Sequence, residues 1–206
     1  MAQFYGDDST FIAPDSTMAT ASASIGVGRA GVKHTTLVYL VDQAASRILL
    51  ALKKRGMGAG KVNGPGGKAD VSAGDTSIRA TAIRETQEEL GITPTDLQAR
   101  GLISFVFTND GEHSWDNDCT IFFGTQWDGE PTESDEMAPE WHPLDAVPYD
   151  RMWPDDELWL PDLLAGKEVY WQFTFDGDAI VDSASYADLP TMLAAIGAPE
   201  AAALDA

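Results

Sequence analysis

The sequence has little cysteine, no long apolar run and few basic residues, and each shortage excludes a class of protein. The single cysteine, Cys119, rules out an internal disulfide framework and favours a reducing compartment. No apolar run approaches the roughly 20 residues that span a membrane. The first residues also lack the basic and apolar stretches of a signal peptide. We therefore expect a cytoplasmic protein with no membrane segment.

The few basic residues are unevenly distributed. The chain has 13 Lys and Arg against 33 Asp and Glu, which gives a formal net charge of -20. This balance argues against a nucleic acid polymer as partner, because Lys and Arg bind the phosphate backbone. Nine of the 13 basic residues lie within residues 47–100. Since salt screens charge beyond about 8 Å, this region could attract a small anion. The alternative interpretation is that the acid excess only maintains solubility.

Composition and hydrophobic period divide the 206 residues into three parts. We interpret residues 1–32 as a flexible extension, residues 33–184 as the folded domain, and residues 185–206 as an acidic, Ala-rich tail with one short helix at most. Strands are expected at 35–41, 47–52, 102–107, 119–127, 169–175 and 179–181, and helices at 76–90 and 155–164. Strands dominate, so the chain is expected to form an α+β fold with helices covering a mixed sheet.

The segment R-E-T-Q-E-E-L-G-I, from Arg84 to Ile92, carries the strongest chemical signal. On a helix, Glu85, Glu88 and Glu89 are at i, i+3 and i+4, on one otherwise exposed face. Their mutual repulsion is relieved by a hard divalent cation such as Mg²⁺, which prefers oxygen ligands. Arg84 can hold one of these carboxylates. A solvated acidic face is the alternative interpretation, because Glu-rich helices are common.

A glycine-rich loop precedes this helix. Gly66 and Gly67, within N-G-P-G-G-K, allow the backbone to approach a ligand closely and to turn a carbonyl group toward a metal. Asp75 is placed to cap the start of the helix. A glycine loop alone is weak evidence, but the loop, the spacer and R-E-x-x-E-E-x-G-U together, where U is aliphatic, match few sequences by chance.

These segments resemble the Nudix hydrolase family, whose box reads G-x5-E-x7-R-E-U-x-E-E-x-G-U. K-K-R-G-M-G-A-G, N-G-P-G-G-K, E-S-D-E-M and M-W-P-D-D are similar, in order, to the MutT-type branch of that family over residues 35–182. The resemblance implies a Nudix fold, with a mixed β-sheet sandwiched between helices. It also implies Mg²⁺-dependent, or Mn²⁺-dependent, hydrolysis of oxidised purine nucleoside triphosphates such as 8-oxo-dGTP to the monophosphate and pyrophosphate, by a monomer.

The resemblance also assigns roles to particular residues. It implies that the metal is bound by the carbonyl group of Gly66 and by Glu85, Glu89 and Glu136, with Glu88 as a further ligand or base and Arg84 beside them in the catalytic group. It implies that the triphosphate is bound by Lys53, Gly67 and Lys68. It implies that the edges of the base are bound by Asn63, Asp155 and Asp156, and that Trp153 stacks on the face of the ring.

Several of these residues also have ordinary structural interpretations. Asp155 and Asp156 could cap a helix, Trp153 could belong to the core, and Cys119 is interpreted as structural. His34, His113 and His142 are scattered without the spacing of a zinc site.

The chain departs from the family pattern in two places. The pattern has 14 residues between the loop glycine and the first helix glutamate, whereas 17 residues, 68–84, separate Gly67 from Glu85 here. The early glutamate of the box therefore corresponds to Asp75 by context or to Thr76 by strict counting. Val62 and Pro65 replace an aromatic pair beside Asn63, which changes the expected base pocket and leaves the glutamate helix intact.

Two other functions compete with this interpretation. A Nudix enzyme for another nucleoside diphosphate derivative, such as a dinucleotide or ADP-ribose, would share the glutamate helix. It would not share the residues that bind the edges of the base, Asn63, Asp155 and Asp156. A catalytically silent nucleotide-binding module would have no need of the complete glutamate set.

Overall fold

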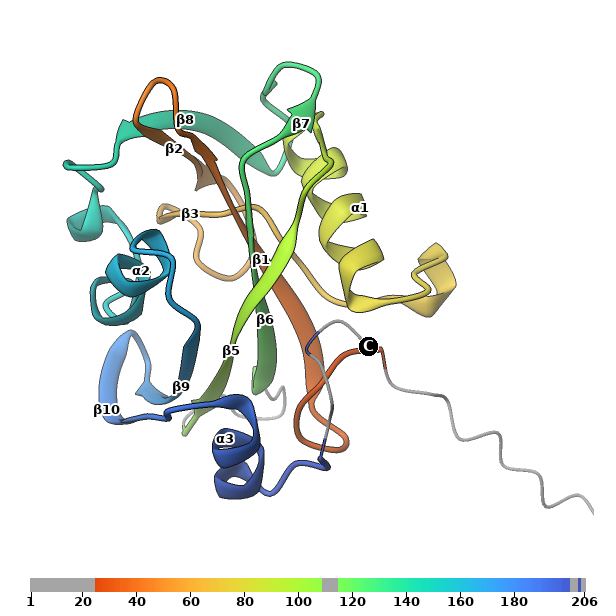
Figure 1. Ribbon diagram of the computed structural model, residues 1–206, viewed down its shortest axis with the longest axis vertical. Coiled ribbons are helices and arrows are strands. Elements are labelled where there is room, and N and C mark those ends of the chain that lie inside the picture. The colour runs from red at the N-terminus through yellow and green to blue at the C-terminus, as the bar shows by residue number, and fades with distance from the viewer. Residues whose placement is uncertain (1–24, 109–114, 201–203, 205–206) are drawn as a thin grey trace, which may run out of the picture.

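One mixed β-sheet with helices on both faces forms the centre of the protein (Figure 1). The computed structural model describes residues 25–108, 115–200 and 204. The strands of the main sheet follow the order β10-β9-β5-β6-β1-β2-β3, and β8 also pairs with β2. They are β1 (Lys33–Asp42), β2 (Arg47–Lys53), β3 (Val62–Asn63), β5 (Gln98–Phe107), β6 (Asn117–Gly124), β8 (Met137–Pro143), β9 (Val169–Asp176) and β10 (Ala179–Ser185).

The remaining elements surround this sheet. They are the short pair β4 (Thr93–Pro94) and β7 (Trp127–Asp128), the helices α1 (Ile78–Leu90), α2 (Asp156–Leu164) and α3 (Leu189–Ile196), and the 3₁₀ turns η1 (Val71–Ala73) and η2 (Tyr149–Arg151). Strand β1 runs parallel to β6, and β5 runs parallel to β9, whereas the other pairings are antiparallel. The α+β fold expected from the sequence is confirmed.

Alternation along β1 separates two hydrophobic layers. Val38 and Leu40 pack toward α1, in a cluster that includes Ile78. Tyr39 and Val41 point to the opposite face, where α2 covers them. Neighbouring side chains of a strand point to opposite faces, so the buried residues 38–41 of one strand support both layers. The helix that carries the glutamates and the helix that begins with the two aspartates therefore lie on opposite sides of β1.

A third cluster shows that the folded unit differs from the expected 33–184. Leu189 and Met192 of α3 pack with Leu102 of β5 and with Val27, which lies before β1. The last part of the predicted extension, residues 25–32, therefore packs on the sheet, as does the helix of the predicted tail. Residues 1–24 of that extension, residues 201–203 and 205–206 of that tail, and His113 lie outside the described residues.

The expected strands and the two expected helices are present with shifted ends, but β8 was missed. Its sequence, M-A-P-E-W-H-P, contains Pro139 and Pro143, which argue against a strand. Strand β8 pairs with β2 alone, so it is an edge strand. Proline is tolerated there because its missing N–H can face away from the paired strand. Among the described residues, no helix is both long and apolar enough to cross a membrane.

Arg29 connects the segment before β1 to the sheet. Its Nε lies 3.0 Å from Oδ1 of Asp118, whose side chain has no exposed surface. Its backbone N–H also donates to Asp118, and its Nη2 donates to the carbonyl of Phe105 at 3.1 Å. A buried carboxylate is therefore neutralised by a residue that the sequence analysis assigned to a flexible extension.

We predict that Arg29→Ala lowers the free energy of unfolding by roughly 3 kcal/mol, because it leaves Asp118 buried without its counter-ion. Chemical denaturation measures this loss. The matched control is Lys167→Ala, which removes an exposed pair with Asp162 and should change stability by less than about 1 kcal/mol. Equal stability of Arg29→Ala and the parent would show that the segment does not pack on the domain in solution.

Candidate active site

Helix α1 carries the glutamate motif, and local chemistry determines where the helix begins and ends. The side chain of Ser77 accepts a hydrogen bond from the N–H of Ala80, which satisfies one free donor of the first turn. Gly91 ends the helix with a φ of 70°. The prediction that Asp75 is the N-cap is wrong, because Ser77 occupies that place and Asp75 binds Arg84 instead.

Asp75 and Arg84 form a buried ion pair at the start of the helix. The two carboxylate oxygens of Asp75 each lie 2.9 Å from a guanidinium nitrogen, Nε or Nη2 of Arg84. The hydroxyl of Thr81 donates to the same carboxylate at 2.8 Å. The hydrogen bonds from Arg84 are the largest influence, and they lower the pKa of Asp75 to about 2. Of the two candidates for the early glutamate of the box, Asp75 contacts the motif, whereas Thr76 is exposed.

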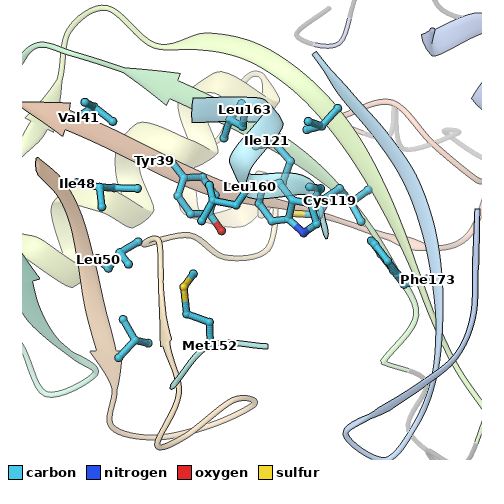
Figure 2. Packing of buried hydrophobic residues seen from close by; sticks show 14 of the residues in the cluster. Tyr39, Val41, Ile48, Leu50, Cys119, Ile121, Met152, Leu160, Leu163 and Phe173 are labelled. Carbon is cyan, nitrogen blue, oxygen red and sulfur yellow. The ribbon is translucent and has the colours of Figure 1, made fainter. Parts of the chain in front are cut away.

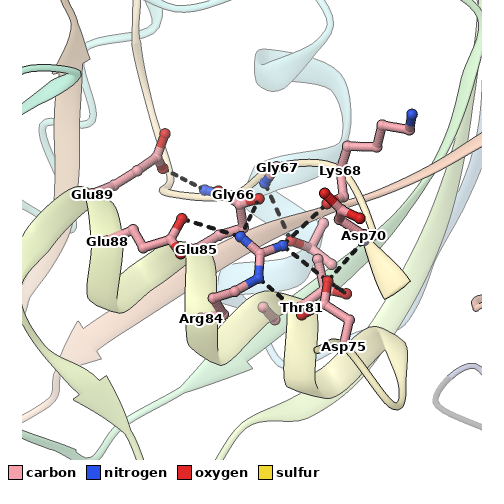
Figure 3. Close-up of polar contacts among 12 residues, drawn as sticks. Gly66, Gly67, Lys68, Asp70, Asp75, Thr81, Arg84, Glu85, Glu88 and Glu89 are labelled. Carbon is pink, nitrogen blue, oxygen red and sulfur yellow. Dashed lines mark hydrogen bonds and ion pairs between the residues drawn. The ribbon is translucent and has the colours of Figure 1, made fainter. Parts of the chain in front are cut away.

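The same guanidinium group neutralises part of the glutamate face (Figure 3). Arg84 Nη1 lies 2.9 Å from Oε1 of Glu85 and 3.1 Å from Oε2 of Glu88. Arg84 Nη2 also donates to the carbonyl of Lys68 at 3.2 Å. Arg84 therefore holds more carboxylates than its spacing alone predicted, and it attaches the helix to the end of the glycine loop.

The glycine loop lies along the edge of β1. The N–H groups of Thr36 and Val38 donate to the carbonyl groups of Gly67 and Pro65, both at 2.9 Å. A Cβ atom on Gly66 would lie 2.0 Å from the Thr36 carbonyl oxygen, so a glycine is required there. Because successive carbonyl groups of an extended chain alternate in direction, the Gly66 carbonyl lies on the side away from β1.

Glu89 lies under this loop rather than on an exposed face. It is 3% exposed, and its Oε2 accepts a hydrogen bond of 2.8 Å from the N–H of Gly66. The expectation of an exposed glutamate face is therefore wrong for Glu89. Glu88, with 59% of its side chain exposed, does fulfil it. Burial raises the pKa of Glu89, and it also raises the pKa of Glu85.

Lys53 bridges two of the predicted metal ligands. Its Nζ lies 2.8 Å from Oε1 of Glu89 and 2.8 Å from Oε1 of Glu136. Arg55 Nη2 lies 3.1 Å from the other oxygen of Glu136. The hydrogen bond from Lys53 is the main reason why the pKa of Glu136 is lowered. Strand β8, which begins next to Glu136, pairs with β2 so that Lys53 faces Met137, and this register brings the two residues together.

The chemistry of these residues suits a divalent cation. Among the described residues, no group of three or more His, Cys, Asp or Glu side chains is already arranged to hold a metal ion. Glu89 and Glu136 nevertheless direct one oxygen each at a single cationic nitrogen. The Lys53 ammonium group thus stands in for a cation among hard oxygen donors, the ligand type that Mg²⁺ and Mn²⁺ prefer.

Gly67 leaves room for a further carboxylate. A Cβ atom at Gly67 would lie 2.4 Å from the carboxyl carbon of Glu85. The absent side chain therefore lets Glu85 lie directly against the loop backbone, on the side where the N–H of Gly66 meets Glu89. This contact explains why Gly67 and Glu85 occur together in the motif, as the contact with Thr36 explains Gly66.

One cavity of about 280 Å³ extends from this carboxylate cluster to the start of α2. The predicted site residues that line it are Lys53, Asn63, Gly66, Gly67, Glu136, Trp153, Asp155 and Asp156. Glu85, Glu88 and Glu89 are not among the residues that line this cavity, although Glu89 binds two residues that do, Gly66 and Lys53. Lys68 is exposed and is not part of the lining, and its predicted contact with the triphosphate stays a prediction.

Asn63 presents its amide group to the cavity in a defined orientation. Its Oδ1 accepts hydrogen bonds from the N–H of Gly64 at 2.8 Å and from the hydroxyl of Tyr39 at 2.7 Å. A backbone N–H can only donate, so the oxygen and the nitrogen of this amide are not interchangeable. The NH₂ group of Asn63 is therefore the donor available to a ligand.

Asp155 and Asp156 are buried carboxyl groups on the same cavity. They are 2% and 1% exposed. Asp155 Oδ2 accepts from Trp159 Nε1 at 3.0 Å, and Asp156 Oδ2 accepts from the N–H of Trp153 at 3.0 Å. Burial raises the pKa of Asp155 to about 6, and burial, followed by the charge of Asp155, raises the pKa of Asp156. Asp155 makes no side-chain cap hydrogen bond, so capping does not explain it.

Trp153 forms one side of this cavity, together with aromatic residues that the sequence analysis missed. Its ring meets Phe175 edge-on, with centroids 5.8 Å apart, and Lys61 Nζ lies 4.6 Å from its centroid. Phe105 and Phe107 also line the cavity. The period of two in F-V-F and F-T-F, on β5 and β9, is the signal that could have identified this wall.

Comparisons with known proteins show what the chain as a whole resembles. A family model described as the NUDIX domain matches residues 32–163. The oxidized purine nucleoside triphosphate hydrolase of Danio rerio is 45% identical over 151 residues, which are 73% of this chain and 92% of that protein. The protein of the same name from Mus musculus is 45% identical over 149 residues, 72% of this chain and 90% of that protein. A MutT protein from Bacillus halodurans superimposes with a TM-score of 0.65 at 27% identity, covering 77% of this chain and all of that chain.

We predict that Asp75→Asn lowers the free energy of unfolding at pH 7 by about 2 kcal/mol. The folded state lowers the pKa of Asp75 from 3.8 to about 2, so this contribution is present above pH 4 and is lost as the pH falls to 2. Denaturation curves of the parent and the variant should therefore converge between pH 4 and pH 2. The exposed Asp182→Asn is the control, and a parent–variant difference independent of pH would contradict the ion pair.

Proposed function

The chain belongs to the Nudix family, and from this we propose that it hydrolyses oxidised purine nucleoside triphosphates to the monophosphate and pyrophosphate with Mg²⁺ as cofactor. The observation that supports the proposal is one cavity lined by Lys53, Glu136 and the glycine loop and also by Asn63, Trp153, Asp155 and Asp156. Nudix hydrolases need a divalent metal. The substrate class is that of the relatives in Danio rerio and Mus musculus.

The residues proposed to bind the base, Asn63, Trp153, Asp155 and Asp156, distinguish 8-oxoguanine from guanine by the donors and acceptors on the edge of the base. Guanine N7 is an acceptor, and oxidation at C8 turns it into an N–H donor. An ionised Asp155 accepts from this donor and repels the normal acceptor. The NH₂ group of Asn63 donates to an acceptor on another edge, while Trp153 packs against the ring. Such a site discriminates strongly because the wrong base leaves buried polar groups without partners.

The carboxylate cluster is proposed to hold the metal and to accept a proton. Glu85, Glu89, Glu136 and the Gly66 carbonyl would bind the divalent cation. When bound, the cation supplies charge neutralisation for the triphosphate and an acidified water. Lys53 releases its carboxylate partners and turns to the phosphates. Glu88, the exposed glutamate, accepts the proton of the attacking water, and the bond to pyrophosphate breaks as the water oxygen bonds to phosphorus.

We predict that Glu89→Gln lowers kcat by at least about 100-fold, because losing a direct ligand exceeds the 10–100-fold effect of disturbing a ligand's partners. Calorimetric titration with Mn²⁺ alone, without nucleotide, should show weaker Mn²⁺ binding in the same variant. The exposed Glu130→Gln is the matched control and should match the parent. Parent-like Mn²⁺ affinity together with kcat within about threefold of the parent would place the metal elsewhere.

We also predict a higher kcat/KM for 8-oxo-dGTP than for dGTP, measured as pyrophosphate release in a panel that includes ADP-ribose and a dinucleotide. Asp155→Asn should lose most of this preference, because an amide cannot accept on both of its atoms. Equal kcat/KM values for 8-oxo-dGTP and dGTP would refute the proposed substrate preference but not the hydrolase activity. Preference for ADP-ribose or the dinucleotide would favour another Nudix substrate, and no metal-dependent turnover would favour a silent binding module.

A further inference from the structure

The backbone of Trp153 is fixed from the core, whereas its side chain is not. Its neighbour Met152 is buried in the core cluster shown in Figure 2. The N–H of Trp153 donates to Asp156 Oδ2 at 3.0 Å. The side chain itself is only partly buried. Its orientation on the wall of the main cavity therefore depends on contacts from other segments of the chain.

The segment between β2 and β3 approaches the ring of Trp153 closely. A Cβ atom on Gly58 would lie 3.1 Å from Trp153 Nε1, so the backbone of this segment lies beside the ring. Lys61 of the same segment places its ammonium group over one face of the ring, with Nζ 4.6 Å from the ring centroid. This distance is within the roughly 6 Å at which an aromatic face attracts a cation.

The position of Lys61 is determined by its backbone. Its N–H donates to the carbonyl of Gly58, and its carbonyl accepts from the N–H of Lys53, both at 2.9 Å. Lys61 does not line the main cavity, although Trp153 does. The ammonium group therefore leaves uncovered the part of the Trp153 ring that meets this cavity.

Asp178 holds the same ammonium group from the turn between β9 and β10. Its Oδ2 lies 3.2 Å from Lys61 Nζ, and the two side chains are 72% and 25% exposed. An ion pair with so exposed a partner contributes little to stability. It does restrict the long side chain of Lys61, and through it the ring of Trp153. The expected effect is therefore on the orientation of the ring rather than on the stability of the fold.

We propose that Lys61 is a positioning residue that, with Asp178 as its counter-ion, holds the ring of Trp153 in the orientation in which it stacks on a purine. The stacking rests on the proposed function, whereas the orientation of the ring in the protein without substrate does not. A side chain that is already ordered loses less conformational entropy on binding, so the gain is in substrate affinity.

The same geometry determines which substrates are affected. A stacking ring contacts the face of the base, which every base has, whereas oxidation at C8 changes the edge. Lys61 therefore acts on oxidised and normal purines alike, in contrast to the residues that bind the edge. The glutamates of α1 are not in contact with Lys61, whose charged contacts are with Asp178 and Trp153. The rate of the chemical step is therefore expected to be independent of Lys61.

The orientation of the ring can be tested without substrate, by fluorine NMR of the full-length protein labelled with fluorotryptophan. The chain has six tryptophans, and Trp153→Phe identifies the Trp153 resonance by its loss. The shift of this resonance between H₂O and D₂O measures the exposure of the ring to solvent. We expect Lys61→Met and Asp178→Asn to increase this shift, and Lys61→Arg, which keeps the cation, to retain the parental value. A parental value in Lys61→Met would overturn the proposal.

Turnover provides the second test. Lys61→Met should raise KM by about threefold to tenfold for both 8-oxo-dGTP and dGTP, as expected for the loss of a cation–π contact. It should leave kcat and the ratio of the two kcat/KM values unchanged, and Lys61→Arg should restore the parental KM. The matched control is Lys167→Met, which also removes a Lys–Asp pair, with Asp162. Lys167 lines neither the main cavity nor its neighbours, so KM should stay parental.

The outcomes separate this inference from the proposed function. A parental KM in Lys61→Met would refute the inference. A changed ratio of the two kcat/KM values would also refute it, because Lys61 would then act on the edge of the base. A parent without preference for 8-oxo-dGTP would instead refute the proposed substrate, while the NMR result would still decide whether Lys61 holds the ring of Trp153.

Discussion

The close approach of the glycine loop to β1 is the contact on which both ends of the site depend. Pro65 and Gly67 accept hydrogen bonds from β1, and no side chain fits at Gly66. This single path along the strand brings the backbone N–H of Gly66 to Glu89 and leaves Asn63 beside Tyr39. Because backbone hydrogen bonds at a strand edge tolerate little displacement, the loop sets the distance between the glutamate cluster and Asn63.

Carboxyl groups lie near both ends of the cavity, with different partners. At the glutamate end, Arg84 and Lys53 approach the glutamates closely, and these pairs offset the repulsion between like charges. At the start of α2, Asp155 and Asp156 are buried with aromatic and backbone donors as partners. Lys53 lowers the pKa of Glu136, whereas burial is the largest influence on Glu89, Asp155 and Asp156 and raises the pKa of each. The depth of burial, more than the presence of a nearby cation, therefore separates these carboxyl groups.

Residues outside the matched family region also belong to the folded unit. Arg29 neutralises the buried Asp118 of β6, the strand next to β1, and Leu189 and Met192 cover β5 and β9 from α3. These contacts stabilise the centre of the sheet rather than the cavity itself. The strand next to β1, which supports Tyr39 and receives the glycine loop, is therefore stabilised by a segment that composition alone assigned to a flexible extension.

Short-range patterns in the sequence determined the glutamate helix, the glycine loop and most strands. Helical spacing puts Glu85 and Glu89 on one face whatever lies around them, and glycine alone tolerates the loop backbone. Only the tertiary structure decided that Lys53 bridges Glu89 and Glu136, that Asp75 binds Arg84 instead of capping, and that β8 is a strand at all. These contacts join residues far apart in the chain. They depend on which strands pair, in which register, and on what the paired sheet buries, and no local period encodes those choices.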